Sequence, residues 1–363
     1  MSDIKELIIF LSQFDLTNHK IGKIIEYLGE DKASIKTFKK AKLDQQNILK
    51  SEDYQKMIEM ADEQLVKTFV INQAERGIKV LCKFDEEYPE KLFFLHDAPY
   101  ILYYMGDISL LNKPSLGVVG TRKPTNYGRM VTEKLVRDVA SAGIVIVSGL
   151  AYGVDSIAHR KCLEVGGKTI AVLGGGFDNI YPSEHKSLAE EIAEKGLLIT
   201  EYRPKRRATQ YTFPTRNRII AGLSDGVLIT EASIKSGTIH TKDFALDYGK
   251  NLYAVPGNID SVSSALPNEI IKSGQGQLVI DANDILKDYD VIKKAKKKNN
   301  EINLSNFTIE EQEILAQLQS GAKTIDELTK NSTLSINIFN TYLTTLEISG
   351  IIRRMPGGFI TLN

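Results

Sequence analysis

Short apolar runs and amphipathic segments alternate through the middle of the chain. A first apolar run at 116–119 is followed by apolar residues at helical spacing as far as Gly143, and a second apolar run follows at 144–147. Such short runs joined by helical segments are typical of a parallel sheet covered on both faces. The alternation continues to about Asp284 and predicts a doubly wound α/β domain. The expected strands are 116–119, 144–147, 169–173, 197–200, 226–230 and 252–255.

Nearly every expected strand is followed by small or polar residues. Since the carboxyl ends of parallel strands meet at one edge of a sheet, we expect these residues to lie together where ligands bind. Glycine loops let a phosphate approach backbone N–H groups, and Arg122 adds a positive charge with donors suited to phosphate. A turn explains any single glycine, but the repetition favours a site for a phosphate-bearing ligand. The residues are Gly120, Ser148, Gly149, Gly174, Gly175, Gly176, Glu201, Glu231, Ser236, Gly237 and Thr238.

The two ends of the chain have different patterns. Residues 1–76 carry apolar positions at helical spacing and predict a small all-α module, similar to SAM-like or helix-hairpin-helix modules. The Gly-x-Gly of a DNA-gripping hairpin is missing there, so we interpret this module as a scaffold or protein-contact element. Two β-rich runs, 78–84 and 100–104, lead into the α/β domain, which we place at 77–289.

The C-terminal part predicts a linker and a winged helix. Residues 290–306 lack apolar periodicity and contain a run of lysines, which favours a linker over a basic tail that touches nucleic acid. Residues 307–363 predict three helices and a hairpin, and Thr324 with Glu327 forms a capping box. The third helix has no Lys or Arg, so we expect protein contact unless Arg353 and Arg354 of the hairpin bind DNA.

Composition narrows the possible classes. A chain of 363 residues suggests two or three domains, and 46 basic residues balance 46 acidic ones, so any nucleic-acid surface must be local. Cys82 and Cys162 lie in apolar patterns and are expected to be buried thiols, with no metal-ligand spacing. The amphipathic start is not a signal peptide, and no run has membrane-spanning length, so we expect a cytoplasmic protein without membrane insertion.

Familiar nucleotide and catalytic motifs are missing. No Gly-x-Gly-x-x-Gly occurs at 117–122, no acidic residue ends the second strand, and there is no P-loop, which disfavours NAD and ATP. Glu201, Asp225, Glu231 and Asp243 lie near the strand ends, and we expect caps and ion-pair partners rather than catalysts. No catalytic residue, cofactor or metal is therefore predicted.

The segment 202–224 contains the longest loop of the α/β region. Its basic residues are interleaved with Tyr211 and Phe213, a combination that suits single-stranded nucleic acid because cations contact phosphates and bases stack on rings. In the alternative interpretation the rings fill the core and the arginines are solvated. Basic residues at a helix start, where acids are preferred, favour the functional interpretation. They are Arg203, Lys205, Arg206, Arg207, Arg216 and Arg218.

Six motifs in a fixed order resemble one protein family. They are GTRKPTNYG, SGLAYGVDSIAH, GGGFDNIYPSEH, FPTRNRIIAGLS, SGTIHT and YAVPGN, and they span about 84–286. Together they resemble the DprA/Smf (DNA-processing protein A) family. The resemblance implies an extended Rossmann fold that binds and protects single-stranded DNA, forms homodimers and loads the RecA recombinase during natural transformation.

The resemblance also implies a set of DNA-binding residues. Phosphates would lie on Gly120-Thr121-Arg122, and a base would stack on Phe213. Gln210 stands where many family members have a lysine, and we expect Lys205 to Arg207 to compensate for the backbone contact. These residues belong to a secondary basic loop (Arg203, Lys205, Arg206 and Arg207). The predicted residues are Gly120, Thr121, Arg122, Ser148, Gly149, Gly174, Gly175, Gln210, Phe213, Arg216, Asn217, Arg218, Ser236, Gly237 and Thr238.

Two other functions remain alternatives to a non-enzymatic mediator. The extended Rossmann group includes lysine-decarboxylase-like enzymes that cleave nucleoside monophosphates with a Pro-Gly-Gly-x-Gly-Thr-x-x-Glu motif. Here Gly237-Thr238 is followed by Ile239-His240-Thr241, and the Pro-Gly-Gly is missing, which argues against that nucleotide chemistry. A pure interaction scaffold would bind RecA or membrane machinery without affinity for DNA.

Overall fold

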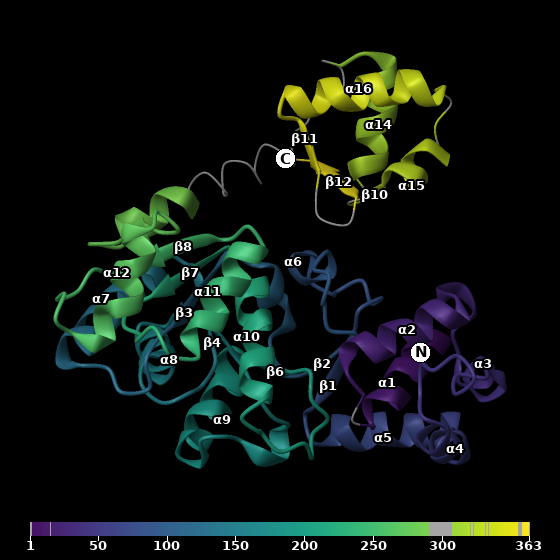
Figure 1. The fold of residues 1–363 in the computed structure, drawn as a ribbon, viewed down its shortest axis with the longest axis horizontal. Helices are drawn as coiled ribbons and strands as arrows, with labels where there is room; N and C mark the ends of the chain where they lie inside the picture. Colours follow the sequence, from purple (N-terminus) through teal and green to yellow (C-terminus); the bar gives the residue numbers. More distant parts are fainter. Residues whose placement is uncertain are drawn as a thin grey trace. The chain divides into compact units, whose positions relative to one another are not determined.

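The computed structural model describes residues 2–14, 16–289, 307–319, 321, 323–330, 332, 334–354 and 358–362. The chain divides into two compact units, residues 1–93 with 97–282 and residues 94–96 with 283–363 (Figure 1). The predicted Lys-rich linker, 290–306, lies outside the described residues. Each unit is described by itself below.

The first unit begins with helices, as predicted. Their side chains at helical spacing, such as Leu7, Leu11 and Ile24, are buried in one apolar cluster, which also takes in Cys82 and Tyr103 of the sheet. The N-terminal helices therefore pack directly on the first two strands. The elements are α1 (Asp3–Ser12), α2 (Asn18–Leu28), η1 (Glu30–Lys32), α3 (Ile35–Lys40), α4 (Ser51–Met60) and α5 (Glu63–Glu75).

A nine-stranded sheet, ordered β1-β2-β6-β5-β4-β3-β7-β8-β9, forms the centre of this unit. Strands β3 to β9 run parallel, and β1 and β2 add an antiparallel edge. All six predicted strands are confirmed, each within a residue or so. The strands are β1 (Lys79–Cys82), β2 (Ile101–Gly106), β3 (Ser115–Val119), β4 (Val145–Ser148), β5 (Thr169–Val172), β6 (Leu197–Thr200), β7 (Gly226–Ile229), β8 (Asn251–Ala254) and β9 (Gln277–Leu278).

Helices cover both faces of the sheet. The crossovers from β3 to β6 move one way across it, and those from β6 to β8 move the other way, so right-handed connections place their helices on opposite faces. Accordingly α7 packs on α8, and α10 lies beside α11 (Figure 1). The helices are α6 (Glu90–Phe93), α7 (Asn126–Ser141), α8 (Val154–Glu164), α9 (Lys186–Lys195), α10 (Thr212–Leu223), α11 (Thr238–Asp247) and α12 (Ala265–Lys272), with short 3-10 turns η2 (Ile108–Asn112), η3 (Phe177–Asn179), η4 (Ser183–His185) and η5 (Val262–Ser264).

The winding direction changes at β3, which pairs with β4 on one side and β7 on the other. In open parallel sheets ligands bind at such a switch point, beyond the carboxyl ends of the strands. We call the loops that follow β3 to β8 the strand-end rim.

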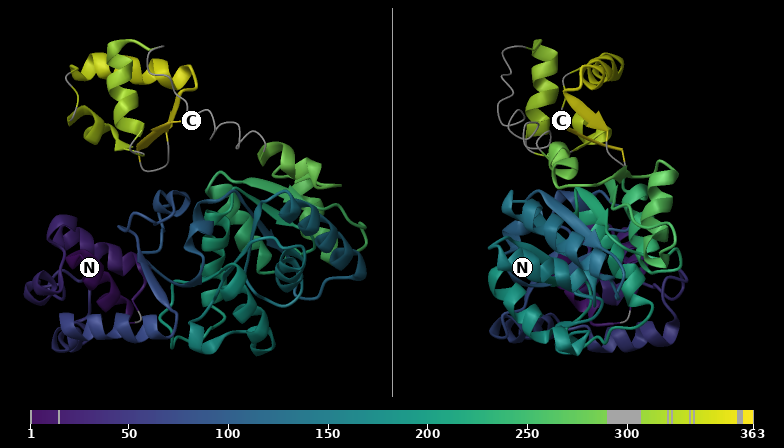
Figure 2. Two further views of the ribbon diagram at one scale, coloured as in Figure 1. Left: turned by 180° about the vertical axis from the view of Figure 1, so that it is seen from behind. Right: turned by 90° about the vertical axis from the view of Figure 1, so that its left-hand side faces the viewer.

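The second unit contains the predicted winged helix (Figure 2). Ile314, Phe339 and Ile360 join its three helices to a small sheet ordered β10-β12-β11. The predicted capping box is confirmed, because Glu327 N donates to Thr324 Oγ1 (3.2 Å) and Thr324 N donates to the Glu327 carboxylate (2.8 Å). The elements are α14 (Ile309–Gln319), β10 (Lys323–Thr324), α15 (Ile325–Lys330), α16 (Ile336–Ile348), β11 (Ile352–Arg354) and β12 (Phe359–Leu362).

Within the described ranges, no helix combines the length and the apolar character that crossing a bilayer requires.

Candidate nucleic-acid interface

The loop after β3 is tied to its neighbours through the backbone. Thr121 N donates to Glu231 O at 2.6 Å, and Val154 N donates to Thr121 O at 3.2 Å. A side chain at Gly120 would place its Cβ 2.7 Å from Glu231 O, so only glycine fits this crossing. The loop is thus held rigidly while the side chain of Arg122 is exposed.

The carboxylate of Glu231 fills the anion position at the switch point. It accepts from Thr125 N (2.8 Å) and Thr125 Oγ1 (2.6 Å) at the start of α7, and Glu231 is only 1% exposed. A Cβ at Gly128 would overlap this carboxylate. Because helix N-termini attract anions, this is where a Rossmann nucleotide phosphate would lie. The chain's own charge therefore excludes a phosphate there.

Beside this blocked position, Phe213 at the start of α10 carries a cluster of rings and charge. Its ring covers Gly174, where a Cβ would lie 2.8 Å from Phe213 Cδ1. The guanidinium carbon of Arg122 lies 5.5 Å from the ring centroid, and the Tyr181 ring lies 5.5 Å away at 51°. We call Arg122, Tyr181 and Phe213 the aromatic cluster. It brings one cation and two rings together from the loop after β3, the loop after β5 and the first turn of α10.

Arg216, one turn along α10, points inward and is only 3% exposed. Its guanidinium donates to Gly149 O (2.6 Å) and Val172 O, and a Cβ at Gly149 would overlap it. Burial lowers the pKa of Arg216 to about 10, which leaves it charged at neutral pH. Arg216 therefore supports the rim from within, whereas the side chain of Arg122 is exposed.

A buried carboxylate completes this support. Asp155 Oδ2 accepts from Gly149 N (3.1 Å) and Ala151 N (3.4 Å). Burial raises the pKa of Asp155, and the charge of Arg216 opposes that rise. Between these contacts Leu150 adopts φ of 58°, a left-handed conformation that a non-glycine residue keeps only when its surroundings hold it. Motif reasoning did not single out Asp155, because its role depends on where Arg216 folds.

The other predicted residues of α10 and α11 also have structural contacts. Arg218, 5% exposed, pairs with Glu201, and although burial alone lowers the pKa of Arg218, Glu201 and Asp97 raise it overall. Asn217 Nδ2 donates to Gly237 O (3.4 Å), linking α10 to the loop before α11. Ser236 Oγ accepts from Thr238 N (3.3 Å) at the start of α11. These contacts align two helix starts along the rim.

The remaining predicted rim residues divide between packing and exposure. Ser148 is fully buried and its hydroxyl donates to Val118 O at 2.6 Å. Gly175 lies against the backbone of Ala208, where a Cβ would meet N at 2.8 Å. The side chain of Gln210 is exposed and therefore accessible to a ligand.

The secondary basic loop is pinned to the loop that follows β5. Gly176 N donates to Arg206 O (2.7 Å), and Asn179 Nδ2 donates to Lys205 O (3.1 Å). The side chains of Lys205 and Arg207 remain exposed. Because the β5 loop also supplies Gly174 and Tyr181, the basic loop continues the surface that begins at the aromatic cluster.

The four acidic residues that the sequence placed near the strand ends all have partners, but one of them is not at the rim. Asp225 precedes β7 and accepts from Ser115 N (2.9 Å) at the start of β3 and from Lys91 Nζ (2.8 Å), so it lies at the opposite, amino-terminal edge of the parallel sheet. Asp243 pairs with Lys242 (2.8 Å). Glu201 and Glu231 are engaged as described above. Among the described residues, no group of three or more His, Cys, Asp or Glu side chains is arranged to hold a metal ion.

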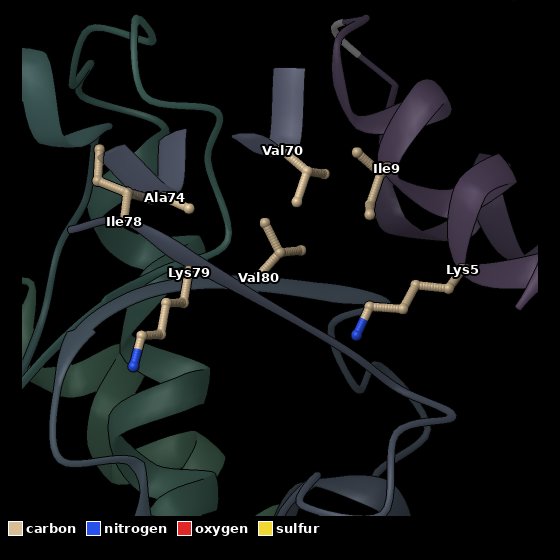
Figure 3. A pocket seen from close by; sticks show the side chains of 7 residues that line it. All are labelled: Lys5, Ile9, Val70, Ala74, Ile78, Lys79 and Val80. Atoms are coloured by element: carbon tan, nitrogen blue, oxygen red, sulfur yellow. The ribbon is translucent and has the colours of Figure 1, made fainter. Parts of the chain in front are cut away.

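A cavity of about 260 Å³ lies elsewhere, where α1 and α5 meet β1 (Figure 3). Apolar side chains, including Ile9, Val70 and Val80, surround it, and Lys5 and Lys79 border it. Lys5 is paired with Asp85 at 2.5 Å. The cavity belongs to the packing of the N-terminal helices on the sheet.

Comparison with known proteins gives two family matches. The model described as DNA recombination-mediator protein A matches residues 79–290, and the DprA winged helix domain matches residues 304–358. DNA processing protein DprA of Bacillus subtilis is 38% identical over 215 residues, or 59% of this chain and 72% of the relative. Protein Smf of Escherichia coli is 34% identical over 283 residues, or 76% of this chain and 75% of the relative.

Two solved structures are similar as well. DNA processing protein A from Streptococcus pneumoniae aligns with a TM-score of 0.67 and 31% identity, over 79% of this chain and 98% of that one. A Helicobacter pylori DNA processing protein A, described for its single-stranded DNA binding mode, aligns with a TM-score of 0.54 and 36% identity, over 58% of this chain and 96% of that one. With a family model that matches more than half of its length, the chain belongs to the DNA recombination-mediator protein A family.

Proposed function

We propose that this protein binds single-stranded DNA along the strand-end rim and acts as a non-enzymatic recombination mediator. The observation that carries the proposal is the aromatic cluster, in which Arg122 lies over Phe213 beside the exposed ring of Tyr181. A cation next to one exposed and one partly buried aromatic ring suits a chain of phosphates and unpaired bases. The single-stranded DNA binding described for the Helicobacter pylori relative supports this choice of ligand.

The DNA strand would contact the exposed side chains, and the buried side chains would hold the exposed ones in place. A base that stacks on Phe213 displaces the Arg122 guanidinium, which then turns to the neighbouring phosphate. The backbone at Gly237, where a Cβ would meet nothing within 4 Å, lets the DNA strand approach closely. Arg216 and Arg218 position the rim from within, because their charges are already used inside the protein. Lys205 and Arg207 extend the phosphate path past Gln210.

The proposed protein partners rest on the family to which the chain belongs, and not on a binding surface identified in the structure. We propose that the protein forms homodimers, protects incoming single strands and loads RecA during natural transformation. The winged helix is assigned to protein contact, because α16 carries no Lys or Arg. The proposed site of action is the cytoplasm.

The enzyme alternative has less support from the rim. Glu201 and Asp243 are each engaged with a neighbour, Glu231 fills the switch point, and Asp225 lies at the opposite edge of the sheet. Incubation with AMP tests it directly. Release of free adenine would revive the enzyme alternative, and intact AMP at high protein concentration would remove it.

Fluorescence anisotropy of a labelled oligo-dT tests the main proposal. We expect tight binding that weakens steeply with salt, because phosphate contacts release counterions. Phe213→Ala should weaken binding about 5- to 100-fold with little change in the salt slope, since stacking involves no charge. Phe339→Ala is not a suitable control, because Phe339 lies in the core of the winged helix and its loss would leave a cavity there. The matched control is Tyr27→Ala, at a tyrosine of α2 that is 46% exposed. Absence of binding by the wild type would refute the proposal.

A further inference from the structure

Tyr181 belongs to the aromatic cluster, but it is not among the DNA-binding residues that the sequence predicts. It lies in the loop after β5, 32 residues before Phe213 in the sequence, and only the fold brings the two rings to 5.5 Å. Half of its surface is exposed, 51%. An exposed ring in a loop has no need of an aromatic neighbour for stability, so this pairing points to the ligand surface.

The backbone on both sides of Tyr181 is anchored although its ring is not buried. Ile180 packs in the apolar cluster with Leu150 and Leu173. His185 Nδ1 donates to Leu150 O at 2.8 Å, which fixes the following turn. The ring is thus held in place from both sides of the loop, as a preformed stacking surface requires.

A core tyrosine in the same unit shows what a structural role looks like. Tyr103 is fully buried, and its hydroxyl lies 2.6 Å from Ser12 Oγ. In contrast, the Tyr181 hydroxyl makes no hydrogen bond to any residue that the structure describes. What Tyr181 offers is therefore the face of its ring.

We propose that Tyr181 is a second base-stacking residue, which takes the nucleotide next to the one stacked on Phe213. This inference rests on the proposed function of the rim. The two rings are tilted by 51°, so they form two platforms with a bend between them. A single strand can bend so that successive bases stack on the two tilted rings. Successive base pairs of a duplex are stacked parallel to one another and cannot adopt this tilt. The pair of rings accordingly favours single strands over duplexes.

A tryptophan reporter tests this contact directly. The chain contains no tryptophan, so Tyr181→Trp introduces a unique indole at the proposed stacking position. Titration with unlabelled oligo-dT should quench its fluorescence in step with binding, and duplex DNA should not. Tyr27→Trp, at another exposed tyrosine on α2, is the control and should show no quenching. Tight binding without quenching of the Tyr181→Trp protein would overturn the inference.

Affinities separate this inference from the proposed function. Tyr181→Ala should weaken oligo-dT binding about 5- to 100-fold without changing the salt slope, and Tyr181→Phe should bind like the wild type. If Phe213→Ala weakens binding and a folded Tyr181→Ala does not, the second platform is wrong and the rim proposal stands. If the wild type does not bind, the proposed function itself fails. Thermal melting of each variant confirms that the comparison is made between folded proteins.

Discussion

The strand-end rim carries its charge in two layers, whereas the winged helix carries little charge where a DNA reader needs it. At the rim, Arg122 is exposed, and behind it Arg216 and Arg218 are buried in contacts with backbone oxygens and Glu201. On the winged helix, α16 exposes Ile336 (63%) and Ile348 (83%) and no cation. Its hairpin offers Arg353, since Arg354 already pairs with Glu347 at 2.9 Å.

This difference shows that architecture alone does not assign the DNA site. Winged helices and extended Rossmann folds both occur in nucleic-acid-binding proteins, so their presence here is equally suggestive. What separates the two units is the placement of cations and open rings. The charges also differ in burial, since the arginines behind the rim are buried and those of the winged helix lie at the surface. Substitutions at each kind of position test this difference.

The largest effect is expected from removing the buried charge behind the rim. Arg216→Met should lower the free energy of unfolding of the first unit by about 3–5 kcal/mol, because Gly149 O and Val172 O lose their donor and the buried carboxylate of Asp155 loses a nearby positive charge. Hydrogen exchange followed by mass spectrometry reports both units in one molecule. Adding Asp155→Asn should recover part of the loss. An Arg216→Met protein with wild-type protection in loop 149–151 would contradict the two-layer description.

Mild acid should destabilise the first unit and spare the winged helix. His159 is fully buried, its ring lies 2.7 Å from Thr169 Oγ1, and burial lowers its pKa to about 3. Between pH 6.5 and 5 only the unfolded chain binds this proton, so the free energy of unfolding should fall by about 2 kcal/mol. The sequence of the winged helix, 307–363, contains no histidine.

The variant His159→Asn isolates this effect. It removes the titrating group and keeps a donor for Thr169, so the stability of the first unit should lose most of its dependence on pH over that interval. For each protein, the free energy of unfolding at each pH is compared with its own value at pH 7. The destabilisation caused by the substitution itself then cancels. An unchanged pH slope in His159→Asn would mean that another group causes the acid sensitivity.

Exposed arginines on the two units should differ in their effect on DNA binding. Arg122→Ala should weaken oligo-dT binding about 10-fold and reduce the slope of log affinity against log salt by about 0.7, the value for one phosphate contact. Arg353→Ala, the matched change on the winged-helix hairpin, should leave both quantities unchanged. The reverse result would move the DNA site to the winged helix.

The smallest effect is expected at the surface ion pair of the winged helix. Arg354→Ala removes the contact with Glu347, in which the arginine side chain is 49% exposed, and should change stability by less than about 1 kcal/mol. Local hydrogen exchange in β11 and α16 measures it. A loss comparable to that of Arg216→Met would erase the contrast between buried and surface charge.

Much of the fold follows from the pattern of apolar residues. The six strands, the N-terminal helices, the winged helix and its capping box were all predictable, since each depends on local spacing or on a local hydrogen bond. The two-residue strand β10 was not, because so short a segment carries no pattern and forms only when β12 lies beside it. Residues 355–357 of the predicted hairpin lie outside the described residues.

The candidate site likewise has features that the sequence predicts and features that only tertiary packing decides. The sequence determined which residue types lie at the strand ends, because a parallel sheet brings all its carboxyl ends to one edge. It did not determine which charges face solvent. Arg122 and Arg216 have the same side chain, and only tertiary packing turns one outward and buries the other against the backbone of Gly149 and Val172.

Tertiary structure alone also joined Tyr181 to Phe213 and set Glu231 at the start of α7. These contacts link loops that follow different strands, so no local pattern encodes them. The sequence by itself specified a parallel sheet with small, polar and basic residues along one edge. The order of the strands decided which of those residues meet, because side chains from distant segments interact only once the sheet has placed their loops side by side.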